Sequence, residues 1–128
     1  MESYKPGVCN IGRNEIRKRY ASGFIFLFIA GVLVISVAAF SLPKLSLLFC
    51  VVPLFLSSEG FYQGYFRFCA GFAARSIFDF SGSSGEKGRV SDDEAHGLDM
   101  RRAKMINLYS VVTAALVTLV IYLAAVVK

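Results

Sequence analysis

The chain has 128 residues, 55% of them hydrophobic, and its mean hydropathy of +0.57 is above that of ordinary soluble domains. Its formal net charge is +5, but the basic residues border long apolar runs instead of alternating with polar residues. This pattern predicts an integral membrane protein whose cationic residues meet anionic membrane lipid, and it argues against nucleic acid as a partner.

A basic N-terminal segment, residues 1–21, precedes the first apolar run. Its cluster of Arg17, Lys18 and Arg19 is expected to contact lipid headgroups. Residues 22–43 then predict the first transmembrane helix, because the run is uncharged, has the roughly 20 residues that a bilayer requires, and ends at Pro43. A signal peptide also has a basic region before an apolar one, but no small-x-small cleavage site opens a polar domain here.

Residues 44–80 predict a second transmembrane helix with an aromatic extension. The apolar run ends near Phe66, and phenylalanines then alternate with Arg67 and Arg75 as far as Phe80. Aromatic rings beside arginines that reach toward water suit a membrane boundary. The extension is therefore expected either to continue the helix past the membrane surface or to bend and lie along it.

Residues 81–105 are expected to form a polar loop on the inner side. Residues 81–85 have the composition of a flexible linker, and the capping box at 91–94 predicts one short helical turn that stops at Gly97. A new helix is expected near Asp99, followed by the third transmembrane helix at 106–128. The predicted fold class is all-α, with three transmembrane helices and a polar inner loop.

The distribution of lysine and arginine predicts the orientation in the membrane. Twelve of these residues lie before the first span or between the second and third, whereas only Lys44 and Lys128 lie on the other side. Because cytoplasmic loops carry the excess of positive charge, we expect a multi-pass protein of the cell membrane with its N-terminus inside and its C-terminus outside.

Small residues predict where the helices approach one another. Gly60, Gly64 and Gly71 fall on one face of a continuous second helix, and the first two form a small-xxx-small pair. The third helix carries a comparable stripe of small and polar residues: Asn107, Ser110, Ala114, Thr118 and Ala125. We expect these two stripes to meet.

Glu59 is a carboxylate within an apolar run, where insertion costs about 2.5 to 3.5 kcal/mol at the centre of a span. Gln63 and Arg67 follow at successive helical turns, so the three side chains predict a polar ladder toward the inner surface. Two interpretations remain open. Glu59 either binds a proton, a cation or a polar partner subunit, or it is a structural residue that is hydrogen-bonded or protonated.

The cysteines offer a second candidate site. Cys9 and Cys69 are both expected on the inner side and could meet, either as a redox pair or in a metal site with His96, while unpaired thiols are the ordinary state in a reducing compartment. No C-x-x-C or H-x-x-x-H spacing supports a metal site. The sequence therefore predicts no cofactor and no catalytic residues.

Two motifs resemble those of a known family. The run Gly7-Val8-Cys9-Asn10-Ile11-Gly12, with Glu15-Ile16 and the basic residues 17–19, precedes a span that leads to Arg67-Phe68-Cys69-Ala70-Gly71-Phe72. These motifs and the layout of the first two spans are similar to small, uncharacterised prokaryotic membrane proteins with a C-N-I-G-x-x-E-I-x-x-R start and an R-F-C-A-G-F centre. The resemblance implies a shared fold and places Cys9 and Cys69 in the motifs, which favours their proximity. Arg13 stands where the family usually has a proline, and the resemblance implies no activity.

The function expected from the sequence is that of an accessory or assembly subunit in a larger membrane complex, because three short spans bury little surface and polar stripes favour partners. Those partners would be other membrane-protein subunits or further copies of the chain. Two alternatives remain: a small redox or metal-handling protein that uses Cys9 and Cys69, and a proton- or ion-conducting oligomer built around Glu59.

Overall fold

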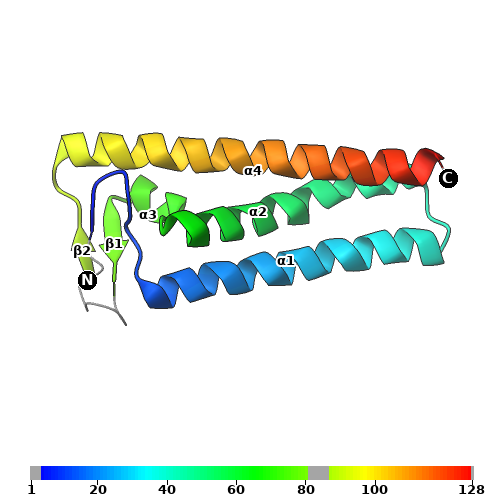
Figure 1. Ribbon diagram of the computed structural model, residues 1–128, viewed down its shortest axis with the longest axis horizontal. Coiled ribbons are helices and arrows are strands. Elements are labelled where there is room, and N and C mark those ends of the chain that lie inside the picture. Colours follow the sequence, from blue (N-terminus) through cyan, green and yellow to red (C-terminus); the bar gives the residue numbers. More distant parts are fainter. Residues whose placement is uncertain (1–3, 81–86, 128) are drawn as a thin grey trace.

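The computed structural model describes residues 4–80 and 87–127. Three helical segments in it are long and apolar enough to cross a membrane: Arg13–Ala39, Lys44–Phe66 and Asp93–Val127. They run side by side, and the remaining elements gather at one end of the bundle (Figure 1). The all-α class predicted from the sequence is confirmed.

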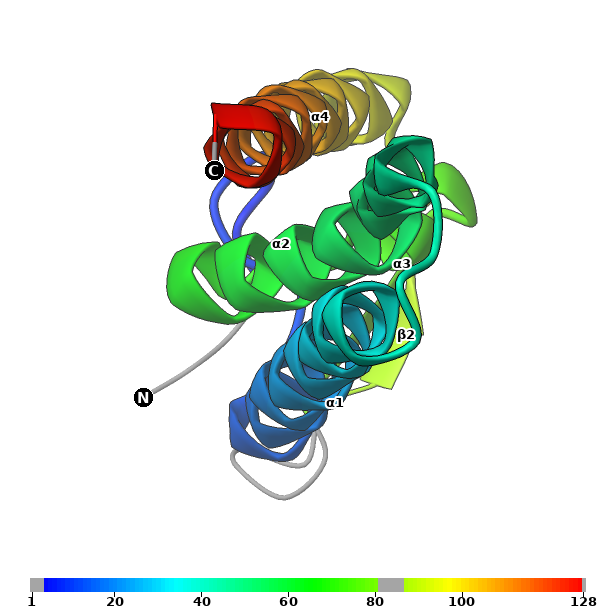
Figure 2. The same cartoon turned by 90° about the vertical axis from the view of Figure 1, so that its right-hand side faces the viewer.

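The middle position in the bundle belongs to α2 (Val51–Phe66). It packs against both α1 (Arg13–Ala39) and α4 (Asp93–Val127), and the view along the bundle shows it between these two helices (Figure 2). Each outer helix therefore packs on one side, mainly against the second span, and turns most of its apolar side chains outward, as helices surrounded by lipid do.

The first helix begins earlier than predicted. The basic residues 13–21 form the first turns of α1 and continue without a break into the uncharged run. The helix ends at Ala39, and the next residues close with a hydrogen bond from Phe40 N–H to Ser36 O and a positive φ of 51° at Ser41. The predicted boundary at residue 22 is therefore wrong as a helix start.

The second span changes its helical form along its length. It begins as the 3-10 helix η1 (Lys44–Cys50) and continues as α2. Pro53 lies in the first turn of α2, where it has no N–H to donate and where its ring crowds the preceding turn. A tighter 3-10 turn before the proline accommodates that ring.

Arg67 ends α2 and corrects the predicted extension to residue 80. Its backbone is left-handed, with φ 56° and ψ 42°. Phe68 N–H donates to Gln63 O and Arg67 N–H to Gly64 O, which is the Schellman pattern of hydrogen bonds that closes a helix. The chain then forms the short helix α3 (Ala70–Ala74) and the strand β1 (Ile77–Asp79), so it neither continues α2 nor lies along the surface as one helix.

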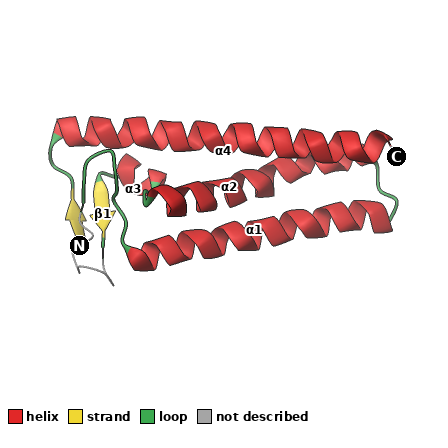
Figure 3. Ribbon diagram, viewed as in Figure 1, coloured by secondary structure: helices red, strands yellow, loops and turns green. Residues whose placement is uncertain are grey.

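Two short strands, which the sequence did not predict, lie beside the helices at the same end (Figure 3). Strand β1 pairs antiparallel with β2 (Lys87–Arg89), from Ile77 opposite Arg89 to Asp79 opposite Lys87. On its other side, Ile11 forms a parallel bridge to Asp79. The linker predicted at 81–85 lies outside the described residues.

The last helix is continuous from Asp93 to Val127, so the predicted stop at Gly97 and new start near Asp99 are wrong. The capping residue is Asp92, one position beyond the predicted serine: its Oδ1 accepts from Glu94 N–H at 3.3 Å. At about 1.5 Å per residue, a helix of 35 residues is longer than a bilayer is thick. Its first turns therefore project with the other polar elements.

The glycines of α2 face α1, which corrects the expected meeting with the stripe on the last helix. A Cβ built on Gly60 would stand 2.6 Å from Arg19 O and 2.8 Å from Gly23 N, and one built on Gly64 would stand 2.8 Å from the Tyr20 ring. Gly71 lies in α3, exposed, and takes no part in this contact. On α4, Ser110, Ala114 and Thr118 of the predicted stripe are buried.

Candidate functional site

The polar cap is the part of the molecule formed by residues 4–12, 67–80 and 87–92 with the first turns of α1 and α4. It brings together the two sequence motifs. Asn10, fully buried, donates from Nδ2 to Cys69 O at 3.1 Å and accepts from Cys69 N–H at 2.7 Å. Its own N–H donates to Arg67 O, and its carbonyl accepts from Asp79 N–H. One amide side chain thus fixes the N-terminal segment on the turn after α2.

Asp99 is the second buried polar residue of the polar cap. It is fully buried on α4 and accepts two hydrogen bonds of 2.7 Å, one from the Tyr4 hydroxyl and one from Gly7 N–H. Burial raises the pKa of the Tyr4 hydroxyl strongly, and its hydrogen bond to the Asp99 carboxylate adds to that rise. Tyr4 also stacks on Phe78, with ring centroids 4.9 Å apart.

Arg19 lies inside the polar cap and not at its surface. Its Nη2 donates to Cys69 Sγ at 3.0 Å and lies 3.4 Å from the Glu15 carboxylate, and its guanidinium lies over the Phe72 ring. The Arg19 guanidinium is thus engaged within the protein, and the headgroup contact expected for it stays a prediction. Arg17 and Lys18 are exposed, and Lys18 also pairs with Glu15 at 3.1 Å.

The cysteines form no disulfide bond with one another in the described chain. Cys9 is half-buried beside Asn10, Cys69 is buried against Arg19, and Cys50 lies in the apolar core toward the opposite end. No group of three His, Cys, Asp or Glu side chains gathers among residues 4–80 and 87–127 in a way that could hold a metal ion.

His96 contacts a serine, whereas a metal site would require it to lie beside the cysteines. Its Nδ1 lies 2.7 Å from the Ser76 hydroxyl, where either atom can donate according to the histidine tautomer. The contact ties α4 to the turn after α3. His96 is thus accounted for as a structural residue of the polar cap.

Above the polar cap, Glu59 lies at the contact between α2 and α4. Gln63 donates to its Oε2 at 2.6 Å, as predicted. With the Asn107 amide oriented so that its nitrogen faces the carboxylate, Asn107 donates to Oε1 at 2.7 Å and to Oε2 at 3.2 Å. The carboxylate therefore joins two helices through two amide side chains.

The environment of Glu59 corrects two expectations. It faces α4, whereas the neighbouring Gly60 and Gly64 face α1, so the carboxylate and the glycines lie on different faces of α2. Arg67, expected to complete the ladder, lies beyond the end of α2, and its carbonyl accepts from Asn10 N–H. The helical polar pair ends at Gln63.

The contacts also set the depth of Glu59 in the bundle. Gly60 packs on Gly23, which lies four residues after the last charge of α1 at Arg19, and Asn107 lies three residues after the last charge of α4 at Lys104. In a membrane this level is the boundary of the hydrocarbon and not its centre. The cost of a carboxylate here is lower than at mid-membrane, because water and headgroups are within reach.

The network remains partly accessible on the surface where α2 and α4 meet. Glu59 and Gln63 are half-buried and Asn107 is exposed. On the adjoining turns, Leu56 of α2 and Val111 of α4 are 37% and 52% exposed, so apolar side chains continue this surface. A carboxylate and two amides thus lie within an otherwise apolar outer face.

Asn10 and Asp99 were not recognised from the sequence as site residues. In the sequence, Asn10 is adjacent to Cys9, the candidate residue of its motif, and Asp99 marks only the expected start of a helix. A usable signal was present for Asp99: with Ala95, Ala103 and Ile106 it continues the buried face of α4, so a carboxylate at that position needs a donor from elsewhere.

Comparison of the chain with protein-family models, with curated proteins and with solved structures gives no match in any of the three. The assignment of a function therefore depends on the geometry of the chain itself.

Proposed function

We propose that this chain is an accessory or assembly subunit of a larger membrane complex, with no catalytic site of its own. The observation that carries the proposal is the accessible polar network of Glu59, Gln63 and Asn107 on the face between α2 and α4. The polar groups on this face leave hydrogen-bonding capacity that lipid chains do not meet.

The carboxylate has more capacity than its two amides use. An ionised carboxylate accepts about four hydrogen bonds, whereas Gln63 and Asn107 supply three contacts at 2.6, 2.7 and 3.2 Å. The amide oxygens of both residues can also accept. The matching partner is a helix that offers a lysine, an arginine, an amide or a hydroxyl at the level of the hydrocarbon boundary, since such groups hydrogen-bond across helices in membranes.

The polar cap supports the same role in a different way. Its buried polar residues Asn10 and Asp99 have their partners within the chain, so it acts as a rigid base that holds α2 and α4 at fixed spacing. A docking face built on fixed helices loses less conformational entropy on association than a mobile one. The proposal therefore assigns the polar cap to positioning and the α2 and α4 face to contact.

A photoreactive amino acid placed in the native membrane tests the proposal. At Val111, one helical turn beyond Asn107 on α4, we expect a cross-link to one defined membrane protein or to a second copy of the chain. At Phe28, 72% exposed on α1, we expect cross-links to lipid alone. Equal protein cross-linking at both positions, or none at Val111, would contradict the assignment of this face.

A further inference from the structure

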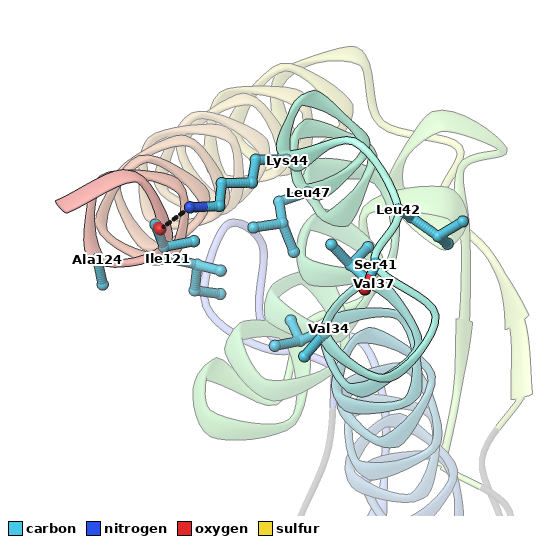
Figure 4. A pocket seen from close by; sticks show the side chains of 10 residues that line it. Val34, Val37, Ser41, Leu42, Lys44, Leu47, Ile121 and Ala124 are labelled. Atoms are coloured by element: carbon cyan, nitrogen blue, oxygen red, sulfur yellow. Dashed lines mark hydrogen bonds between the residues drawn. The ribbon is translucent and has the colours of Figure 1, made fainter. Parts of the chain in front are cut away.

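A pocket of about 700 Å³ opens at the end of the bundle opposite the polar cap. It lies where α1 and α4 are held apart by η1, and its walls include Val34 and Val37 of α1, Leu47 of η1 and Ile121 of α4 (Figure 4). Side chains from three elements converge on this space, and nearly all of them are apolar. A volume of this size is typical of pockets that hold small molecules.

Among the described residues that line the pocket, Lys44 is the only charged one. Its Nζ donates to Ala125 O on α4 at 2.7 Å, where it satisfies a carbonyl of the last helical turn (Figure 4). An ammonium group has three N–H donors, so two remain for another acceptor. No aspartate or glutamate lines this pocket, and across 20–58 and 105–127 of the described chain Lys44 is the only charged residue.

We propose that this pocket binds an anionic acyl lipid, with the chain between α1 and α4 and the carboxylate or phosphate of the head on Lys44. The apolar walls match a hydrocarbon chain, and the positive charge of Lys44 at the rim, which no aspartate or glutamate among the described lining residues faces, matches a negative head. Lys44 and Pro43 end the first uncharged run, so the rim lies at the headgroup level of a membrane that the helices cross. This site is separate from the docking face between α2 and α4.

Native mass spectrometry of the purified full-length chain tests the proposal, with phosphatidylglycerol and phosphatidylcholine of identical chains supplied in separate mixed micelles. One phosphatidylglycerol is expected to stay bound at collision energies that release phosphatidylcholine. A parallel measurement with stearate distinguishes the source of the acyl chain, because a fatty acid and an anionic phospholipid both combine a negatively charged head with an apolar tail. Equal retention of the anionic and zwitterionic lipids, or retention of none of the three, would overturn the proposal.

Substitutions locate the retained lipid. Lys44→Gln keeps a donor for Ala125 O but removes the charge, and it is expected to weaken binding about five-fold, the factor for one lysine at an anionic membrane surface. Ala124→Phe, on the pocket wall, is expected to abolish retention, whereas Ala115→Phe, exposed on α4 away from the pocket, is expected to leave it unchanged.

Arg17→Gln removes an equal charge at the opposite end and serves as the control for net charge. It is expected to leave the tightly retained lipid in place. If Arg17→Gln lowered retention as much as Lys44→Gln, the lipid would be held by the basic polar cap and the pocket assignment would fail. Lys44 is exposed, so its substitution by glutamine leaves the core packing unchanged. Lys44→Gln therefore tests the pocket assignment even if Ala124→Phe disturbs folding.

Discussion

Asn10 is the residue on which the arrangement of the polar cap depends most. It makes four hydrogen bonds, two through its side chain to Cys69 and two through its backbone to Arg67 and Asp79. Residues 4–12 otherwise form only turns and isolated bridges. The fully buried Asn10 amide bonds to both the N–H and the C=O of Cys69. These hydrogen bonds hold the segment where a helix or a sheet would otherwise do so.

Asn10→Ala is therefore expected to lower the free energy of unfolding by about 3 kcal/mol, since two buried backbone groups of Cys69 lose their partners at roughly 1 to 3 kcal/mol each. Thermal unfolding in mild detergent measures the change. The control is Asn14→Ala, exposed on α1, which is expected to shift stability by no more than about 0.5 kcal/mol. Equal effects of the two substitutions would rule out the assigned role of Asn10.

Tyr4 gives the polar cap a dependence on alkaline pH. Its pKa is raised in the folded chain above the ordinary value of 10.0, so the folded state keeps a proton that the unfolded state releases. The stabilisation is complete below pH 10 and is lost as the pH rises toward the folded pKa. The difference in stability between the native chain and Tyr4→Phe should be constant up to about pH 9 and shrink above pH 10. A difference that grows with pH would contradict the contact to Asp99.

At the scale of elements, the sequence predicted the three spans because uncharged runs of membrane length are a strong signal. It did not predict the break after α2, because the left-handed position there is occupied by Arg67 and not by the glycine that usually marks it. It wrongly predicted a helix end at Gly97, because a glycine often marks a helix end but is also tolerated within a helix when the neighbouring turns pack well. The strands were missed because three-residue segments carry no detectable alternation.

Gly60 and Gly97 both lie within helices, but their substitution by alanine is expected to change stability in opposite directions. Gly60→Ala places a Cβ within 3 Å of α1 backbone atoms that cannot move aside, so α1 and α2 must separate, and we expect a loss of about 1 to 3 kcal/mol. Gly97→Ala meets nothing within 4 Å and should gain roughly 0.5 to 1 kcal/mol through helix propensity. Unfolding in the same detergent compares them. A gain for Gly60→Ala would show that the helices do not approach as closely as described.

For the site, the sequence predicted the pairing of Glu59 with Gln63, because residues four apart share a helix face. It could not predict Asn107 as the partner from α4, since which faces of two helices meet depends on packing of the whole bundle. The glycine stripe was assigned to the wrong neighbour for the same reason. The contact between the two motifs through Asn10 and Cys69 likewise depends on the turn after α2, which was not foreseen.

At the scale of the whole molecule, positive charge gathers at one end. The twelve lysines and arginines that precede the first span or separate the second and third belong to the polar cap and the adjoining turns of α1 and α4, whereas Lys44 lies at the far end. The first two spans bring the chain back to the end where it began, so the N-terminal segment and the start of α4 lie together (Figure 1). The third span then carries the C-terminus to the opposite end.

Reporter fusions test this orientation. A reporter inserted between residues 81 and 85 is expected to read as cytoplasmic, and one fused after the last residue as external, because the excess of lysine and arginine stays in the cytoplasm. Substitution of the exposed Arg17 and Lys18 by glutamine should weaken this preference without changing the number of spans. A cytoplasmic reading at both positions would contradict a three-span chain.

The association of this chain with other subunits is the central claim, and the mass of the particle extracted in gentle detergent tests it most directly. After the bound detergent is subtracted, the protein mass of the native particle should exceed the 14.0 kDa of one chain, and subunit identification distinguishes foreign subunits from further copies. Glu59→Gln, which keeps most of the hydrogen bonding, should preserve that particle, whereas Glu59→Leu should weaken association by about 1 kcal/mol, about five-fold in the dissociation constant, and so raise the fraction of free chain. A native chain that migrates alone, or a particle that Glu59→Leu leaves unchanged, would contradict the account.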